Sequence, residues 1–209
     1  MKRSRRIVLA CAAALMSTPL LVAAGDGWKL HPDGFGQKSL AAWKAQQGEP
    51  DSHGDANQAL YFQKLVATAV TAAGVAAFDV PDGTTVADIT PLAFDWRVDG
   101  HCGAGAPRFN LQYRNPPDTA VLTAFVGGCA NMVQTPTADP RWIRASTALP
   151  TGAVFPLDPA HPPTAESLVV GLSLVFDEGI DSPPNPGFVY LDNIQVGTTV
   201  WTSASDNGG

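Results

Sequence analysis

The stretch HCGAGAPRFNLQYR, residues 101–114, decides the fold class. In its second half Phe109, Leu111 and Tyr113 alternate with polar residues. Successive side chains of an extended chain point to opposite sides, so this alternation predicts a β-strand with one buried and one solvated face. We therefore predict a strand over residues 107–114.

The same reasoning extends to most of the chain after residue 60. Residues 91–100, PLAFDWRVDG, alternate in the same way. Four further candidate strands are TAVLTAFVGG, RWIRASTAL, SLVVGLSLVFDEG and GFVYLDNIQVG, separated by clusters rich in Pro, Gly and Asn. Short strands divided by such turn signals are typical of an antiparallel sandwich. We predict an all-β fold, an antiparallel β-sandwich of the jelly-roll kind with about eight strands.

The segment before these strands is ambiguous. KSLAAWKAQQG, residues 38–48, has Ser39 as a possible N-cap and Gly48 as a stop, which favours one short helix near the N-terminus. An irregular strand is an equally open interpretation. Residues 59–80 are rich in Ala but also in β-branched and aromatic residues, and we predict two strands there with a turn near residues 71–74.

The first 24 residues have the pattern of a secretory signal peptide. Lys2–Arg6 is basic, Ile7–Val22 is apolar, and Val22-Ala23-Ala24 fits the small-residue rule for cleavage. Lipoprotein processing at Cys11 is disfavoured, because only four apolar residues would precede it. We expect a secreted or periplasmic protein in which residues 25–200 form a single β-sandwich domain and residues 201–209 a flexible tail.

Charge limits the partners of the mature chain. Without residues 1–24 the chain has nine Lys and Arg against nineteen Asp and Glu, a net charge of −10. Nucleic acids and anionic membrane surfaces bind basic patches, so neither is an expected partner. Residues 25–209 contain no segment long and apolar enough to span a bilayer. We expect a monomer.

Two cysteines, Cys102 and Cys129, remain after the signal peptide. An even number in an exported protein favours one disulfide. A reactive pair of Cys102 with the neighbouring His101 is the alternative, and an oxidising compartment disfavours it.

The usual catalytic signatures are missing from the sequence. There is no G-x-S-x-G elbow and no phosphate-binding loop, and Asp177 and Glu178 are adjacent, so on a strand they would point to opposite faces. The loop that contains Asp51 and Asp55 fails as an EF-hand, because its twelfth position is Phe62 instead of Glu. An enzyme is therefore the less favoured class.

The closing stretch GFVYLDNIQVG resembles the last strand of the galactose-binding-like jelly rolls among carbohydrate-binding modules. The resemblance implies a structural calcium held by Asp192 together with a group from the N-terminal strand, for which Asp26 and Asp33 are available. The motif CGAGAPRFN followed by GGCAN is also similar to a group of exported bacterial proteins without assigned activity, and it implies no chemistry.

A polar face is the candidate ligand surface. We expect strands 92–99 and 107–114 to pair antiparallel across a seven-residue loop, which would gather their polar side chains on one face together with an exposed Trp142. The residues of this surface are Asp95, Arg97, Asp99, Arg108, Asn110, Gln112, Arg114 and Trp142. Amides among charges suit the hydroxyl groups of sugars. Cross-strand Asp–Arg pairing alone would also produce such a pattern.

Three functions follow as hypotheses. The first is a non-catalytic module that binds glycan or cell-wall polysaccharide. The second is a structural or protein-interaction domain of the cell envelope with no small ligand. The third is a jelly-roll hydrolase or lyase whose residues are scattered in the sequence. A fold of this kind hosts many functions, so the site has to decide between them.

Overall fold

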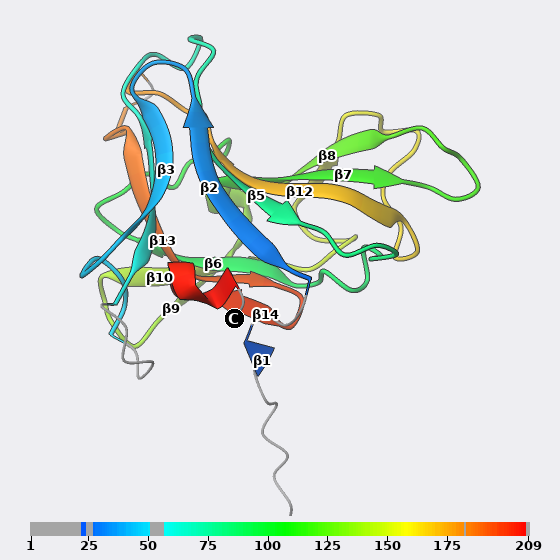
Figure 1. The fold of residues 1–209 in the computed structure, drawn as a ribbon. Helices are drawn as coiled ribbons and strands as arrows, with labels where there is room; N and C mark the ends of the chain where they lie inside the picture. Colours follow the sequence, from blue (N-terminus) through cyan, green and yellow to red (C-terminus); the bar gives the residue numbers. More distant parts are fainter. Residues whose placement is uncertain (1–21, 24–26, 51–56, 182, 208–209) are drawn as a thin grey trace, which may run out of the picture.

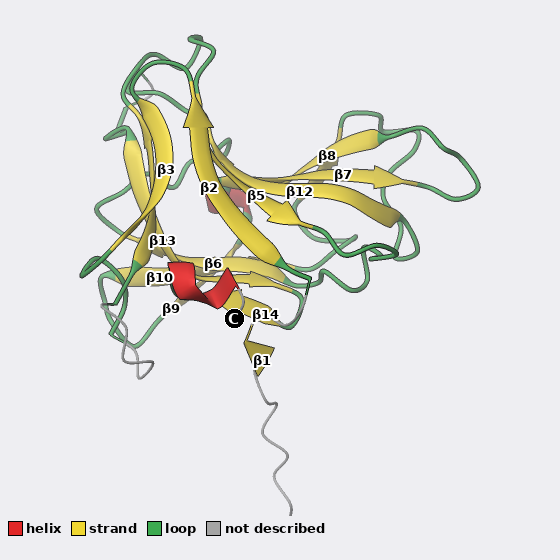
Figure 2. Ribbon diagram, in the orientation of Figure 1, coloured by secondary structure: helices red, strands yellow, loops and turns green. Residues whose placement is uncertain are grey.

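The protein is an all-β sandwich, as predicted. The structure is a computed structural model and describes residues 22–23, 27–50, 57–181 and 183–207. Strands dominate it, and two short 3-10 turns complete it, η1 (Cys129–Asn131) and η2 (Ala204–Asn207) (Figure 2). Within the part of the chain that the structure describes, no helix is long and apolar enough to cross a membrane.

The two sheets are called sheet A and sheet B. Sheet A contains β1 (Val22–Ala23), β3 (Ser39–Lys44), β4 (Ala59–Lys64), β6 (Leu92–Arg97), β9 (Val133–Pro136), β10 (Trp142–Thr147), β13 (Phe188–Val196) and β14 (Thr199–Trp201). Sheet B contains β2 (Lys29–Phe35), β5 (Ala73–Asp79), β7 (Arg108–Arg114), β8 (Leu122–Gly127), β11 (Val154–Pro156) and β12 (Leu168–Phe176). The pairings are antiparallel except for that of β1 with β14.

The strand order is that of a jelly roll. The centre of sheet A runs β4-β13-β6-β10 and the centre of sheet B runs β5-β12-β7-β8. Along the chain these eight strands alternate between the sheets, except for the hairpin β7–β8. Two such interlocked Greek keys define the jelly-roll sandwich, and six further strands bring the total in the described residues to fourteen, more than the predicted eight or so. Figure 1 shows the strong twist of sheet B, in which β2 runs steeply whereas β7 and β12 run nearly across the view.

The core lies between the sheets and is rich in aromatic rings. Phe78 and Phe109 of sheet B have ring centroids 6.3 Å apart, and Phe109 contacts Phe94 of sheet A at 5.9 Å. Trp201 of β14 packs against Phe78 at 5.2 Å and is fully buried. Complete burial of a large aromatic side chain contributes roughly 1.5–3 kcal/mol to folding. Residues 201–207, expected to form a flexible tail, instead complete β14 and form η2 (Figure 1).

The predicted pairing of strands 92–99 and 107–114 is wrong. These strands are β6 and β7, and they belong to opposite sheets. Alternation reports only that a strand has an inner face, and here the inner faces of β6 and β7 meet across the core through Phe94 and Phe109. The connection between them crosses from one sheet to the other instead of turning back as a hairpin.

The predictions for residues 38–48 and 59–80 had different outcomes. The short helix near the N-terminus is wrong, because Ser39–Lys44 is β3 and pairs with β4 along its full length. Pairing in a sheet has overridden a weak helical preference. The two strands predicted in residues 59–80 are confirmed as β4 and β5, but they lie in different sheets, joined by residues 65–72.

The disulfide between Cys102 and Cys129 is confirmed. Its S–S distance is 2.02 Å, and its Cα atoms are 5.0 Å apart. It joins the β6–β7 connection to η1, which follows β8.

Candidate functional site

The outer face of sheet B carries the candidate site. In β7 the inner residues Phe109, Leu111 and Tyr113 are fully buried, so their neighbours face outward. The pairings align one outward residue from each of the six strands into a row, in the order Phe155, Phe125, Asn110, Ser173, Ala77 and His31. The middle of this row has small side chains whereas one end has two aromatic rings, so the face is hollowed.

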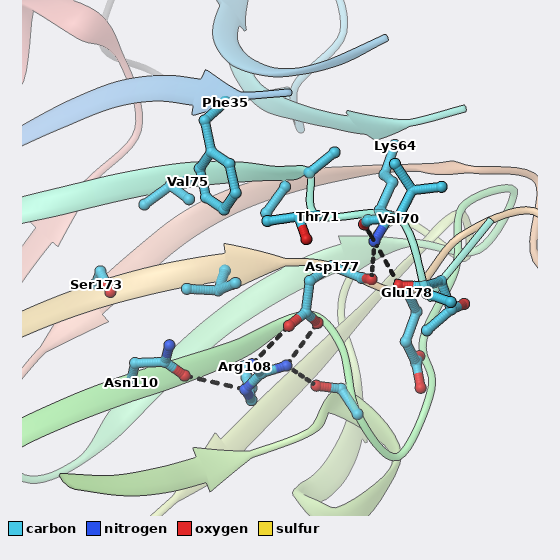
Figure 3. A pocket seen from close by; sticks show the side chains of 16 residues that line it. Phe35, Lys64, Val70, Thr71, Val75, Arg108, Asn110, Ser173, Asp177 and Glu178 are labelled. Atoms are coloured by element: carbon cyan, nitrogen blue, oxygen red, sulfur yellow. Dashed lines mark hydrogen bonds and ion pairs between the residues drawn. The ribbon is translucent and has the colours of Figure 1, made fainter. Parts of the chain in front are cut away.

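The larger hollow on this face has a cavity volume of about 660 Å³. Val75 and Val175 line its apolar part. Asn110 and Ser173 supply an amide and a hydroxyl (Figure 3). Phe35, at the end of β2, lines the hollow and is 52% exposed. A hollow with apolar walls and a few polar groups is the usual form of a ligand site.

Arg108 is the main cation of the hollow and is held by four hydrogen bonds. Its two Nη atoms donate to the Asp177 carboxylate at 2.6 and 2.7 Å. Nη1 also donates to the Gly105 carbonyl, and Nε donates to Oδ1 of Asn110 at 2.9 Å. The guanidinium carbon lies 4.4 Å from the centre of the Phe125 ring. Such a bidentate, stacked arginine is fixed in position.

The glycine-rich turn before β7 forms a wall of the hollow. His101 Nε2 lies 2.5 Å from Oε2 of Glu178. A Cβ atom added at Gly103 would lie 2.2 Å from that carboxylate, and one added at Gly105 would lie 2.5 Å from it. The two glycines therefore allow Glu178 to pack against the turn. Asp177 and Glu178 follow the end of β12 and are not on a strand, so the expected opposite faces do not apply: both line the larger hollow, although they contact different partners.

Lys64 is a buried lysine whose ammonium group hydrogen-bonds to residues at the rim of the hollow. Its side chain is 1% exposed, and Nζ donates to the carbonyls of Thr68, Val70 and Asp177 at 2.9, 2.9 and 2.7 Å (Figure 3). Burial lowers the pKa of this ammonium group, and the carboxylates of Asp177 and Asp181 act in the opposite direction. The three bonds join residues 68–70, which line the hollow, to the end of β12.

A smaller hollow of about 330 Å³ adjoins the first, because Gly105 and Arg108 line both. Its other walls include Phe125, Phe155 and Asn131. Phe155, on the edge strand β11, is 49% exposed. We call the two hollows together the groove.

The structure divides the residues of the expected ligand surface between two faces. Arg108, Asn110, Gln112 and Arg114 lie together on the outer face of sheet B. Asp95 and Arg97 lie on sheet A. Arg97 donates to Asp99 and to Gln47, and its guanidinium lies 3.8 Å from the centre of the Tyr190 ring.

The expectation that Trp142 is exposed is wrong. It lies on β10 opposite Arg97, but only 1% of it is exposed. Alternation located its strand correctly, but it says nothing of other segments that cover a sheet. Sequence reasoning also missed the groove residues Phe35, Lys64, Val75, Phe125, Phe155 and Ser173, since each strand was treated without its partners.

A third hollow, of about 630 Å³, lies on sheet A, and its lining includes Glu49, Asp192 and Asn193. Asp192 stands directly opposite Asp95 in the pairing of β13 with β6. Each of the six carboxylate oxygens of Glu49, Asp95 and Asp192 accepts a hydrogen bond. The Asn193 amide donates to both Glu49 and Asp95, at 2.9 and 2.8 Å.

Asp192 makes stability depend on pH. Its pKa is raised from 3.8 to about 7, chiefly by burial and also by the carboxylates of Glu49 and Asp95, whereas two backbone N–H groups act in the opposite direction. The folded protein therefore binds this proton more tightly than the unfolded chain, so stability present below pH 4 is lost as pH rises through 7. We expect Asp192→Asn to flatten the decline in melting temperature between pH 4 and 7.5, measured by scanning calorimetry in EDTA. Parallel curves for the two proteins would contradict this.

Calcium at Asp192 stays a prediction. Asp26, its expected partner, lies outside the described residues. Among the described residues no group of three or more His, Cys, Asp and Glu side chains is arranged to hold a metal ion. Protein groups instead donate hydrogen bonds to the carboxylate oxygens of Glu49, Asp95 and Asp192. Calorimetry of the wild type and of Asp192→Asn at pH 8, in calcium and in EDTA, tests the prediction. A melting temperature that is higher in calcium than in EDTA for the wild type alone supports calcium binding, and no rise rules it out.

Comparisons of the chain with protein-family models, with curated proteins and with solved structures found no match.

Proposed function

We propose that the chain is an exported, non-catalytic β-sandwich that binds glycan or cell-wall polysaccharide in the groove of sheet B. The observation that carries the proposal is the composition of the groove, in which an amide and a hydroxyl lie between exposed phenylalanines. Asn110 and Ser173 stand opposite each other on β7 and β12. Phe35 and Phe155 lie at the two ends.

The pattern suits sugars for two physical reasons. Hydroxyl groups need donors and acceptors spaced along a surface, and amides and hydroxyls provide both. The less polar faces of a sugar ring need apolar surface, which exposed aromatic side chains supply at little entropic cost because they have only two rotatable bonds. Export is supported by the disulfide, a bond typical of oxidising compartments.

The proposal predicts that Asn110→Ala weakens retention by a bound polysaccharide. Losing one hydrogen bond to a ligand costs about 1 kcal/mol, which is roughly a fivefold loss of affinity. Affinity electrophoresis in native gels that contain soluble polysaccharides measures this, with melting temperature as a check on the fold. The matched control is Gln63→Ala, which removes an amide from β4 of sheet A and is expected to leave retention unchanged.

Three outcomes would contradict the proposal. Failure of every polymer in a broad panel to retain the wild type would favour the structural or protein-interaction hypothesis. Equal loss of retention in Asn110→Ala and Gln63→Ala would place binding elsewhere. New reducing ends in the polymer would support the hydrolase hypothesis instead.

A further inference from the structure

The charged groups of the groove are already neutralised by one another. Four of the five N–H groups of Arg108 are committed to protein acceptors, two of them to Asp177. An arginine that recognises a carboxylate or sulfate needs its two-pronged edge free for the ligand. Here Asp177 occupies that edge, so Arg108 serves as a wall of the groove and leaves little positive charge for an anion.

The other charges beside the groove also disfavour an anionic ligand. The Lys64 ammonium is enclosed by three carbonyl groups and is 1% exposed. Asp33, opposite Val75 on β2, adds an exposed carboxylate to the same face. Asp79 adds another, paired with His31 at 2.9 Å. Lys29 and Arg114 also lie on the outer face of sheet B, but they line neither hollow. Among the described residues, each cation that lines the groove is paired within the protein, so a polyanion in the groove meets no free cation.

Apart from the charged side chains that are paired within the protein, the polar side chains that line the larger hollow are uncharged. Oδ1 of Asn110 accepts from Arg108, and Figure 3 shows its Nδ2 pointing away from Arg108. The hydroxyls of Ser173 and Thr71 also line the larger hollow. The residues that line the groove come from six neighbouring strands, from Phe155 of β11 to Phe35 of β2, and five spacings of about 4.8 Å give a width of roughly 24 Å. That width exceeds a single sugar ring.

We propose that the groove selects an uncharged glycan chain and excludes anionic polymers, and that the Arg108–Asp177 pair sets this preference. The inference rests on the proposed function and specifies its ligand. Phe35 and Phe155 contact the chain near the ends of the groove, and Asn110 and Ser173 hydrogen-bond to its hydroxyl groups between them.

The test compares polymers that share a backbone and differ in charge. Hydroxyethyl cellulose and carboxymethyl cellulose form one such pair, neutral arabinoxylan and acidic glucuronoxylan another, and galactomannan and polygalacturonate widen the panel. For the wild type we expect at least one neutral polymer to be bound about tenfold more tightly than its anionic counterpart, a difference of about 1.4 kcal/mol.

Asp177→Asn gives the decisive variant. It releases the guanidinium of Arg108 and is expected to create retention by the anionic polymer that falls as sodium chloride is raised. Asp79→Asn is the matched control, since it removes the same charge from the same face without touching Arg108. The double variant Asp177→Asn/Arg108→Gln is expected to lose the new retention.

The possible results distinguish a failure of this inference from a failure of the proposed glycan binding. If no polymer is retained, the proposed function fails. If only anionic polymers retain the wild type and Asn110→Ala weakens that retention, the groove binds glycans but the inference is overturned. If Asp177→Asn gains no anionic retention, or Asp79→Asn gains as much, the role of the Arg108–Asp177 pair is overturned.

Discussion

Replacing Lys64 by methionine is expected to lower the free energy of unfolding by about 4 kcal/mol, because three carbonyl groups lose a charged donor. Methionine has a similar length and stays apolar, so the change removes the hydrogen bonds with little change in volume. The three acceptors, in Thr68, Val70 and Asp177, have their bonds to Nζ at 2.7–2.9 Å. Urea denaturation followed by tryptophan fluorescence measures the loss.

The control for this prediction is Lys29→Met. Lys29 begins β2 and its side chain is exposed, so the same substitution is expected to change the unfolding free energy by less than about 0.5 kcal/mol. A loss below about 1 kcal/mol for Lys64→Met would show that the enclosed ammonium contributes little. The rim of the groove would then be stabilised by other contacts.

The double variant Cys102→Ser/Cys129→Ser is expected to lose about 3.5 kcal/mol of stability. The bond closes a loop with a sequence separation of 27 residues. In the chain-entropy account, removing the cross-link increases the entropy of the unfolded chain. For a loop of this length the gain stabilises the unfolded state by about 3.5 kcal/mol at 25 °C. Denaturant unfolding of the oxidised wild type and of the variant gives the difference.

Reduction provides an independent check on the disulfide. Dithiothreitol is expected to bring the wild type close to the variant and to leave the variant unchanged. Equal stability of the oxidised wild type and the variant would contradict the prediction. Because Cys129 is fully buried, the serine hydroxyl adds a small further cost in the variant.

Individual strands were predictable from the sequence, whereas their neighbours were not. The alternation around Phe109 and Phe94 locates β7 and β6 within a residue or two at each end. It depends on which residues are buried, and that is a local property. The partner of a strand depends on how the chain crosses the core, and the connection that contains Cys102 carries no local signal of such a crossing.

The candidate site could be predicted only in part for the same reason. The polar row of β7 was visible in the sequence, and Asn110 lies in the groove. Its neighbours Phe125 and Ser173 come from β8 and β12, and the row exists only after those strands are paired in register. The burial of Lys64 beside the groove could not be predicted from the sequence, because a lysine in a strand pattern is normally exposed. Only the fold brings three carbonyl groups around its ammonium group.

The jelly-roll order has a consequence for the time course of folding. In sheet B the strand β12 separates β5 from β7, and in sheet A the strand β13 separates β4 from β6. Both separating strands come from the last quarter of the chain. A ribosome-bound chain that ends before residue 168 therefore contains β5 and β7 without β12 between them, and β4 and β6 without β13 between them. Contacts between such distant segments form slowly, because the entropy of closing long loops must be lost first. Assembly of the sandwich is thus expected to be a late, cooperative event that begins when the C-terminal strands have been synthesised.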